Sequence, residues 1–124
     1  MDIQEAIIAF DALSQETRLK AFRLLVKAGP DGVAAGVLSK TLNTPHNTLS
    51  FHLNHLTNAG LVSSKKAGRS VIYAARFDAM SELIGFMVKD CCGAEQATIR
   101  ENKANGCSII ELSNYCETPD TNRA

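Results

Sequence analysis

A threonine followed by a proline, Thr44-Pro45, restricts the fold of this chain more than any other pair of residues. Threonine is a common N-cap residue, and proline suits the first position of a helix, where its missing N–H would have no partner in any case. The segment HNTLSFHLNHLTNAG then ends at Gly60 and has leucines at the i, i+4, i+7 spacing of an amphipathic helix, namely Leu49, Leu53 and Leu56. We therefore expect a helix to begin abruptly at this step.

Shorter helical patterns precede the break. Residues 3–12 have apolar side chains at helical spacing, and a second helix is expected from a Ser14 cap to the terminator Gly29-Pro30. The segment VAAGVLSKTL predicts a third, shorter helix just before Thr44. Two short helices separated by a tight break are the pattern of a helix-turn-helix.

The segment after Gly60 predicts a β-hairpin. LVSSKKAGRSVIYAA is rich in β-forming residues at both ends and basic at its centre, which gives a wing with three cations near its tip, Lys65, Lys66 and Arg69. Asp78 is expected to cap a last helix over 79–90. The expected fold is mainly α with a small β-hairpin, a winged helix-turn-helix over residues 1–92. Residues 93–124 would form a polar, partly disordered tail that contributes cysteines.

The charge of the chain is unevenly distributed. The net charge is zero, yet residues 13–76 hold nine Lys or Arg against two acidic residues, and residues 77–124 hold four against eight. A basic middle followed by an acidic end favours a polyanion as partner of the middle, and the alternative is an ordinary solvated basic surface.

Several classes of protein are disfavoured by the sequence. No apolar run reaches the length of a membrane helix, and the first residues, MDIQEAIIAF, lack the basic flank of a signal peptide, so we expect a cytoplasmic protein without membrane contact. In that reducing compartment four cysteines indicate reactive thiols or soft-metal ligands. No glycine-rich phosphate loop or activated nucleophile motif is present, so we expect no enzyme.

The helix after Pro45 offers a face suited to DNA. If its leucines point inward, Phe51 lies on the outer face, where it would contact thymine methyl groups, or alternatively a neighbouring helix. His52 lies nearer the buried edge and is expected to be structural. Recognition helices present their N-terminal residues to the major groove while wings contact phosphates. The predicted DNA-binding residues are His46, Asn47, Thr48, Ser50, Phe51, Lys65, Lys66 and Arg69.

Three segments resemble the winged-helix ArsR/SmtB repressors of bacteria: ALSQETRLKAFRLL, LSKTLNTPHNTLSFHLNHLTNAGLV and GRSVIYAA. The resemblance covers about residues 5–92. It implies a homodimer, joined through the first and last helices, that sits on double-stranded operator DNA and leaves it when a metal or metalloid binds. It also implies that His46, Asn47, Ser50 and Phe51 approach the bases, although the Phe51 position is typically polar. The apolar surface of that dimer would come from Ile7, Phe10, Met80, Leu83, Ile84 and Met87.

The two familiar inducer sites of that family are missing. Its arsenic-sensing members carry a C-x-C pair in the third helix, where this chain has DGVAAGVL. Its zinc-sensing members carry Asp-x-His early in the last helix, where this chain has Asp78-Ala79-Met80, and no histidine follows His55. An inducer is therefore expected to bind elsewhere.

Cys91 and Cys92 are the candidate sensing residues. Cys91 continues the apolar stripe of the last helix and alone would be a buried thiol, but this leaves Cys92 unexplained. Adjacent cysteines fit a disulfide badly, whereas both can donate to one thiophilic centre. Some members of the family that this chain resembles place their sensing thiols at the end of this same helix. The resemblance therefore favours trivalent arsenic or antimony (arsenite or antimonite) as the inducer. No permanently bound cofactor is expected.

A third thiolate is expected from Cys107. The loop from Cys92 closes at modest entropic cost, and Asn105-Gly106 provides a turn beside it, whereas Cys116 is expected to be unused. If only the pair binds, the inducer would be an organoarsenical such as methylarsenite.

Two other functions stay open from the sequence. One is a redox-sensing repressor that joins Cys92 to Cys107 or Cys116. The other is a dimeric interaction module without DNA binding, which salt-dependent affinity for duplex DNA would exclude.

Overall fold

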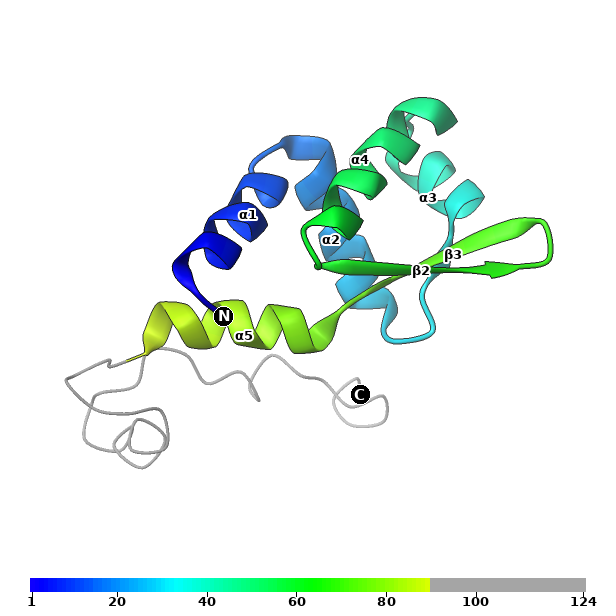
Figure 1. Cartoon of the computed structure of the whole chain (residues 1–124). Coiled ribbons are helices and arrows are strands. Elements are labelled where there is room, and N and C mark those ends of the chain that lie inside the picture. The colour runs from blue at the N-terminus through cyan, green and yellow to red at the C-terminus, as the bar shows by residue number, and fades with distance from the viewer. Residues whose placement is uncertain (90–124) are drawn as a thin grey trace, which may run out of the picture. The chain divides into compact units, whose positions relative to one another are not determined.

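The computed structural model describes residues 1–89, which contain five helices and a three-stranded antiparallel sheet (Figure 1). In chain order the elements are α1 (Ile3–Leu13), α2 (Glu16–Ala28), β1 (Val33–Ala34), α3 (Ala35–Leu42), α4 (His46–Asn58), β2 (Val62–Ala67), β3 (Ser70–Ala75) and α5 (Phe77–Val88). Residues Met1–Phe86 form one compact unit. The predicted winged helix-turn-helix is confirmed, with a three-stranded sheet where the sequence predicted a hairpin alone.

Helix α1 buries a face of small side chains. It begins with a capping box, in which the Asp2 carboxylate accepts from the Glu5 N–H at 2.8 Å and the Glu5 carboxylate accepts from the Asp2 N–H at 2.9 Å. The buried face consists of Ala6, Ala9 and Ala12. The large apolar side chains are between 42 % and 61 % exposed, namely Ile3, Ile7, Ile8 and Phe10. Helix α1 thus lies against α2 and α4 through alanines and leaves an apolar surface outside.

The predicted Ser14 cap of α2 is wrong. The Ser14 hydroxyl donates to the Asp11 carbonyl at 2.8 Å, which closes the last turn of α1. The N-cap of α2 is Gln15, whose side-chain oxygen accepts from the Arg18 N–H at 2.9 Å. Both helices are therefore capped by adjacent residues, and the serine serves the preceding one.

The turn between α3 and α4 is Asn43-Thr44-Pro45. Asn43 adopts the left-handed conformation with φ 51°, which asparagine tolerates better than most residues. Thr44 is not the N-cap predicted from the sequence, because its hydroxyl donates back to the Leu42 carbonyl at 3.0 Å. Pro45 holds the N-cap position, and its carbonyl accepts from the Leu49 N–H at 2.9 Å. The helix therefore begins one residue later than expected.

The sheet has the order β1-β3-β2, and β1 is the element that sequence reasoning missed. It has only two residues, in which Val33 pairs with Tyr73 and Ala34 with Ile72. Strands β2 and β3 form the predicted hairpin, joined by a two-residue turn at Gly68-Arg69 in which Gly68 has φ 65°. The wing is therefore anchored to the start of α3 by β1.

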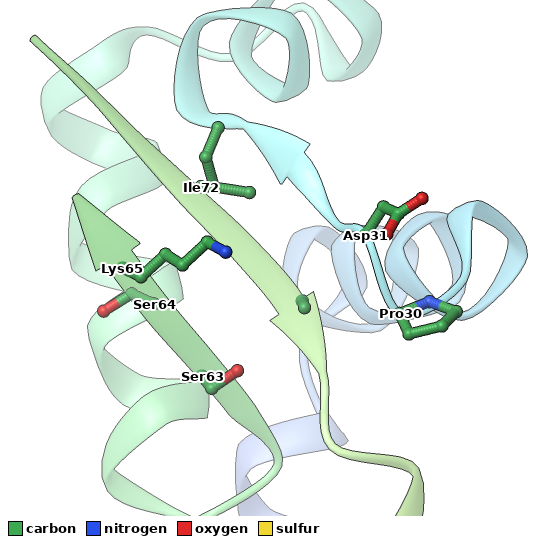
Figure 2. Close-up of a pocket in the computed structure, with 7 residues that line it drawn as sticks. Pro30, Asp31, Ser63, Ser64, Lys65 and Ile72 are labelled. Carbon is green, nitrogen blue, oxygen red and sulfur yellow. The ribbon is translucent and has the colours of Figure 1, made fainter. Parts of the chain in front are cut away.

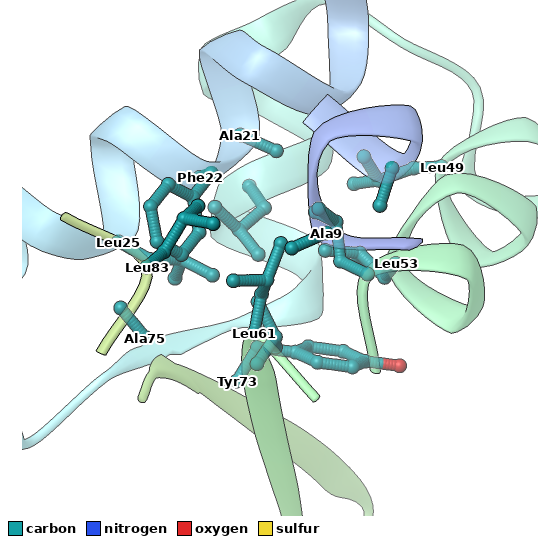
Figure 3. Close-up of a cluster of buried hydrophobic side chains, with 14 of the residues drawn as sticks. Ala9, Ala21, Phe22, Leu25, Leu49, Leu53, Leu61, Tyr73, Ala75 and Leu83 are labelled. Atoms are coloured by element: carbon teal, nitrogen blue, oxygen red, sulfur yellow. The ribbon is translucent and has the colours of Figure 1, made fainter. Parts of the chain in front are cut away.

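The core joins all five helices to the sheet, as Figure 3 shows for part of it. Its fully buried large side chains come from α2, α3, α4 and the junction of α4 with β2, namely Leu25, Leu38, Leu49, Leu53, Leu56, Leu61 and Val62. Leu83 of α5 is 6 % exposed and belongs to this core, so it is not part of an open dimer surface as the sequence suggested. Helix α5 starts two residues earlier than predicted, and Asp78 lies in its first turn rather than at its cap.

Candidate nucleic-acid interface

Helix α4 is held in the unit by its three leucines, each at most 1 % exposed. The inward face predicted from the leucine spacing is therefore confirmed. Because a helix turns 100° per residue, the opposite face is open to solvent, and its exposed residues are Asn47, Phe51, Asn54 and Asn58.

The N-terminal end of α4 presents several hydrogen-bonding groups. His46, Asn47 and Thr48 are exposed, and Ser50 is half-buried. The Asn47 side-chain oxygen accepts from the Thr48 N–H at 2.9 Å, which leaves the Asn47 amide NH2 group to donate outward. The first N–H groups of a helix have no intrahelical partner and carry a partial positive charge. This end of the helix can therefore donate to phosphates and to base edges.

Phe51 lies at the centre of the exposed face. Its side chain is 66 % exposed, and its ring meets the His52 ring edge-on, with centroids 5.7 Å apart and an interplanar angle of 65°. The alternative that Phe51 packs against a neighbouring helix within residues 1–89 is wrong. A large apolar side chain left in water amid asparagines is suited to contact with an apolar group of a partner.

His52 is half-buried and lies beside Arg18 of α2. The Arg18 Nη1 is 3.2 Å from His52 Nδ1, and Arg18 Nε donates to the Ala12 carbonyl at 2.6 Å. Burial lowers the pKa of His52 below its usual value of 6.5, and the charges of Arg18 and His55 lower it further. His52 is therefore structural, as its position in the sequence suggested. Its partner Arg18, 34 residues away, could not be found from the helical pattern.

The wing places its cations in water. Lys65, Lys66 and Arg69 are exposed, and the two lysines, opposite Ile72 and Val71 of β3, point to opposite faces of the hairpin. Figure 1 shows the hairpin tip and the N-terminal end of α4 on the same side of the unit. The wing tip and the N-terminal end of α4 thus lie on one side of the unit.

A hollow of about 280 Å³ lies between the wing and the turn after α2 (Figure 2). Asp31 lines it from the turn and Lys65 from β2, and the opposed strands supply the small side chains of Ser63 and Ala74. The hollow exists because these small residues stand opposite each other on one face of the sheet.

The predicted metal ligands Cys91, Cys92 and Cys107 lie outside the described residues, as does Cys116. Within residues 1–89, no group of three or more His, Cys, Asp or Glu side chains is placed to hold a metal ion. Among the helices described here, none is long and apolar enough to span a membrane.

Comparison with known proteins places the chain among transcription factors. Residues 13–64 match the Helix-turn-helix domain family. The chain is 32 % identical over 79 residues to the HTH-type transcriptional regulator YceK of Bacillus subtilis, and the match covers 63 % of this chain and 78 % of YceK. An ArsR-like transcriptional regulator from Rhodococcus sp. RHA1 has a TM-score of 0.61 and 27 % identity, over 86 % of this chain and 96 % of that one. This chain is a transcriptional regulator of the ArsR family.

One protein with a similar fold is known to be a homodimer. The winged helix-turn-helix DNA-binding domain Mb0332 from Mycobacterium bovis, described as homodimeric in solution, has a TM-score of 0.59 and 21 % identity over 69 % of this chain and 78 % of that one. Because the chain belongs to a family of helix-turn-helix transcriptional regulators, it binds DNA and is not an enzyme. The alternative of an interaction module without DNA binding is therefore set aside.

Proposed function

We propose that this ArsR-family regulator is a homodimeric repressor that reads its operator with the N-terminal half of α4 and releases it when trivalent arsenic binds its cysteines. The observation that carries the DNA-reading part is the open face of α4, on which Phe51 is 66 % exposed among polar residues while the leucines of the same helix are buried.

The chemistry of that face suits a major groove. The Asn47 amide and the Ser50 hydroxyl can pair with base edges, and the Phe51 ring can pack against a thymine methyl group. The exposed wing cations Lys65, Lys66 and Arg69 supply phosphate contacts, which add affinity without sequence preference. This division predicts a preference for A·T pairs where Asn47 and Phe51 approach.

A homodimer through α1 and α5 is supported by the apolar surface of α1. Ile7 and Phe10 are 53 % and 42 % exposed, and exposed apolar side chains of this size on one helix are typical of an interface. A dimer places two copies of α4 on successive major grooves, with half-sites about 34–36 Å apart. Palindromic DNA is therefore the expected operator.

The inducer site is proposed from the cysteines. All four lie beyond residue 89, and the part of the chain described here offers no competing cluster of metal ligands. Cys91 and Cys92 are next to each other, so they can both bind one arsenic, and Cys107 would complete three thiolates. A two-thiolate site made by the pair alone would instead select methylarsenite.

Release follows if arsenic binding changes the spacing of the two recognition helices. A coupling free energy of about 1–3 kcal/mol, typical of allosteric proteins, lowers operator affinity about 5-fold to 150-fold. Because the pair at residues 91 and 92 follows closely in sequence on α5, which ends at Val88, ligand binding there would act on the proposed dimer interface.

The test is fluorescence anisotropy of the reduced protein on DNA from its own promoter, titrated with arsenite, antimonite and methylarsenite. Arsenite should dissociate the wild-type protein from the DNA. The variants Cys91→Ser and Cys92→Ser should bind the operator as the wild type does and should stay bound when arsenite is added. Cys116→Ser is the matched control and should respond like the wild type. Release by methylarsenite alone would support the two-thiolate site, whereas release by oxidant without arsenic would replace the proposal by the thiol-redox repressor.

A further inference from the structure

We propose that Arg18 and His52 form a positioning pair that fixes the orientation of α4, and with it the ring of Phe51, relative to the C-terminal end of α1. The inference rests on the proposed function in one respect, that α4 is the helix that reads the operator.

Arg18 is a buried cation held by two helices other than its own. Its side chain is 9 % exposed, and it is the one charged residue in the buried set of residues 1–89. Nε donates to the Ala12 carbonyl of α1 at 2.6 Å, and Nη1 lies 3.2 Å from His52 Nδ1 of α4. A buried charge requires hydrogen-bond partners, so the guanidinium restrains all three helices at once.

The contact defines the chemical state of His52. A guanidinium has only N–H donors, so His52 Nδ1 must accept and the proton of the neutral ring must sit on Nε2. A doubly protonated ring could not accept from Arg18 and would place two positive groups 3.2 Å apart. The pair therefore exists only with a neutral His52.

The Ala12 carbonyl is available because of its place in α1. The helix ends at Leu13, and the last four carbonyls of a helix have no intrahelical partner. Arg18 satisfies one of them from the first turn of α2. A shift of α1 along its axis would consequently move the guanidinium that His52 contacts.

His52 passes this restraint to the exposed face of α4. Its ring contacts Phe51 edge-on, and it lies between the buried leucines and the open face. One turn further along α4, His55 Nε2 lies 3.4 Å from Asp11 Oδ2, which also belongs to the end of α1. The charged or titratable groups near His52 are thus Arg18 from α2 and His55 from its own helix. Asp11 of α1 contacts His55.

The contacts of Arg18 and His52 therefore connect two surfaces of the unit, the outer face of α1 and the exposed face of α4. The outer face of α1 is the apolar surface proposed for the dimer, and its inner end is joined through one arginine and one histidine to the centre of the base-reading face. Sequence discrimination should therefore depend on the pair more strongly than overall DNA affinity does.

The experiment measures the ratio of affinities for operator DNA and for a scrambled duplex, together with urea unfolding of each variant. His52→Leu should lower the ratio about tenfold, the size of one lost base contact, while affinity for scrambled DNA stays within about twofold. His52→Asn should retain the ratio within about threefold, because its Oδ1 can accept from Arg18 in place of Nδ1. His55→Leu, the same change on the same helix, removes the contact with Asp11 but keeps the one between Arg18 and His52, and it should lower the ratio by less than about threefold.

Equal ratios for His52→Leu and the wild type would overturn the positioning pair. If His52→Leu does not fold, imidazole 15N NMR of the wild type decides, because a ring protonated on Nδ1 at about pH 8 contradicts the contact. Phe51→Ala and Ser50→Ala separate the two proposals: if neither changes the ratio, α4 does not read the operator and the proposed function fails. If they lower the ratio but His52→Leu does not, only the positioning pair fails.

Discussion

The carbonyl oxygen of Tyr73 occupies the space in which any residue other than glycine would place its Cβ at position 32. Gly32 also has φ 79°, in the region that glycine adopts without strain. The two residues stand where β1 begins its pairing with β3, so the close approach of Gly32 to Tyr73 is what allows the wing to join the start of α3.

Gly32→Ala should therefore destabilise the fold. The substitution combines a steric clash against backbone with an unfavourable φ, and we expect a loss of about 2–4 kcal/mol in the free energy of unfolding. Urea unfolding followed by circular dichroism measures it. Gly36→Ala is the matched control: its added Cβ meets nothing within 4 Å, and in the first turn of α3 it should stabilise by at most about 0.5–1 kcal/mol. Equal effects of the two changes would contradict this account of Gly32.

Phe51→Ala should separate DNA reading from stability. The side chain is 66 % exposed, so the free energy of unfolding should change by less than about 0.5 kcal/mol, while operator affinity falls by about tenfold or more. Leu53→Ala, two residues along the same helix and 1 % exposed, should instead cost about 2–5 kcal/mol of stability. An operator affinity that survives Phe51→Ala would remove Phe51 from the base-reading set.

Replacing one wing cation should weaken binding to all DNA sequences alike. Lys65→Ala, Lys66→Ala or Arg69→Ala each removes one phosphate contact from each protomer, so for a dimer on its operator the slope of log affinity against log salt should decrease by about two. Anisotropy titrations at several salt concentrations give this slope. Lys20→Ala is the control, because Lys20 pairs with Glu16 of α2 at 2.7 Å and is not part of the proposed interface. A wing variant that keeps the wild-type slope would show that its cation does not contact phosphate.

Stability should fall in mild acid because of His52. Its pKa is lowered mainly by burial, then by Arg18, so between that lowered pKa and 6.5 the unfolded state binds more protons than the folded state. The free energy of unfolding therefore rises with pH through this window. The contribution of His52 to stability is lost as the pH falls through the same window.

Urea unfolding of the wild type and of His52→Asn between about pH 5 and about pH 8 isolates this contribution. The difference between the two proteins should shrink or change sign in acid. His55 and its contact with Asp11 at 3.4 Å are present in both proteins, so the comparison between the two isolates His52. A difference that does not vary with pH would contradict the assignment.

The elements that follow from local patterns were predictable. The leucine spacing of α4 defined its buried face, and a basic segment between two β-forming runs defined the wing. The caps were less predictable, because Ser14 and Thr44 can serve the helix before them as well as the one after, and in both cases the preceding helix has the hydroxyl. Local sequence does not decide between these two partners.

Long-range contacts lay beyond the sequence patterns. The Arg18–His52 contact joins residues of two helices, and β1 is too short to leave a periodic signal. Leu83 has the spacing of a surface stripe on α5, yet it completes the core against the other elements. Each of these three features depends on how the helices pack against one another and the sheet. The spacing of apolar residues within one helix gives no information on that packing.

The alanine face of α1 has a consequence for how the regulator responds to its own abundance. Alanine loses little apolar area on burial, so α1 gains little from packing within its own chain, whereas Ile7 and Phe10 can be covered by a second copy. For a dimer that closes through α1, the melting temperature should rise with protein concentration by mass action. Dilution would then loosen α1 and weaken the proposed repression. The number of copies in a cell would thus affect the response in addition to the proposed inducer.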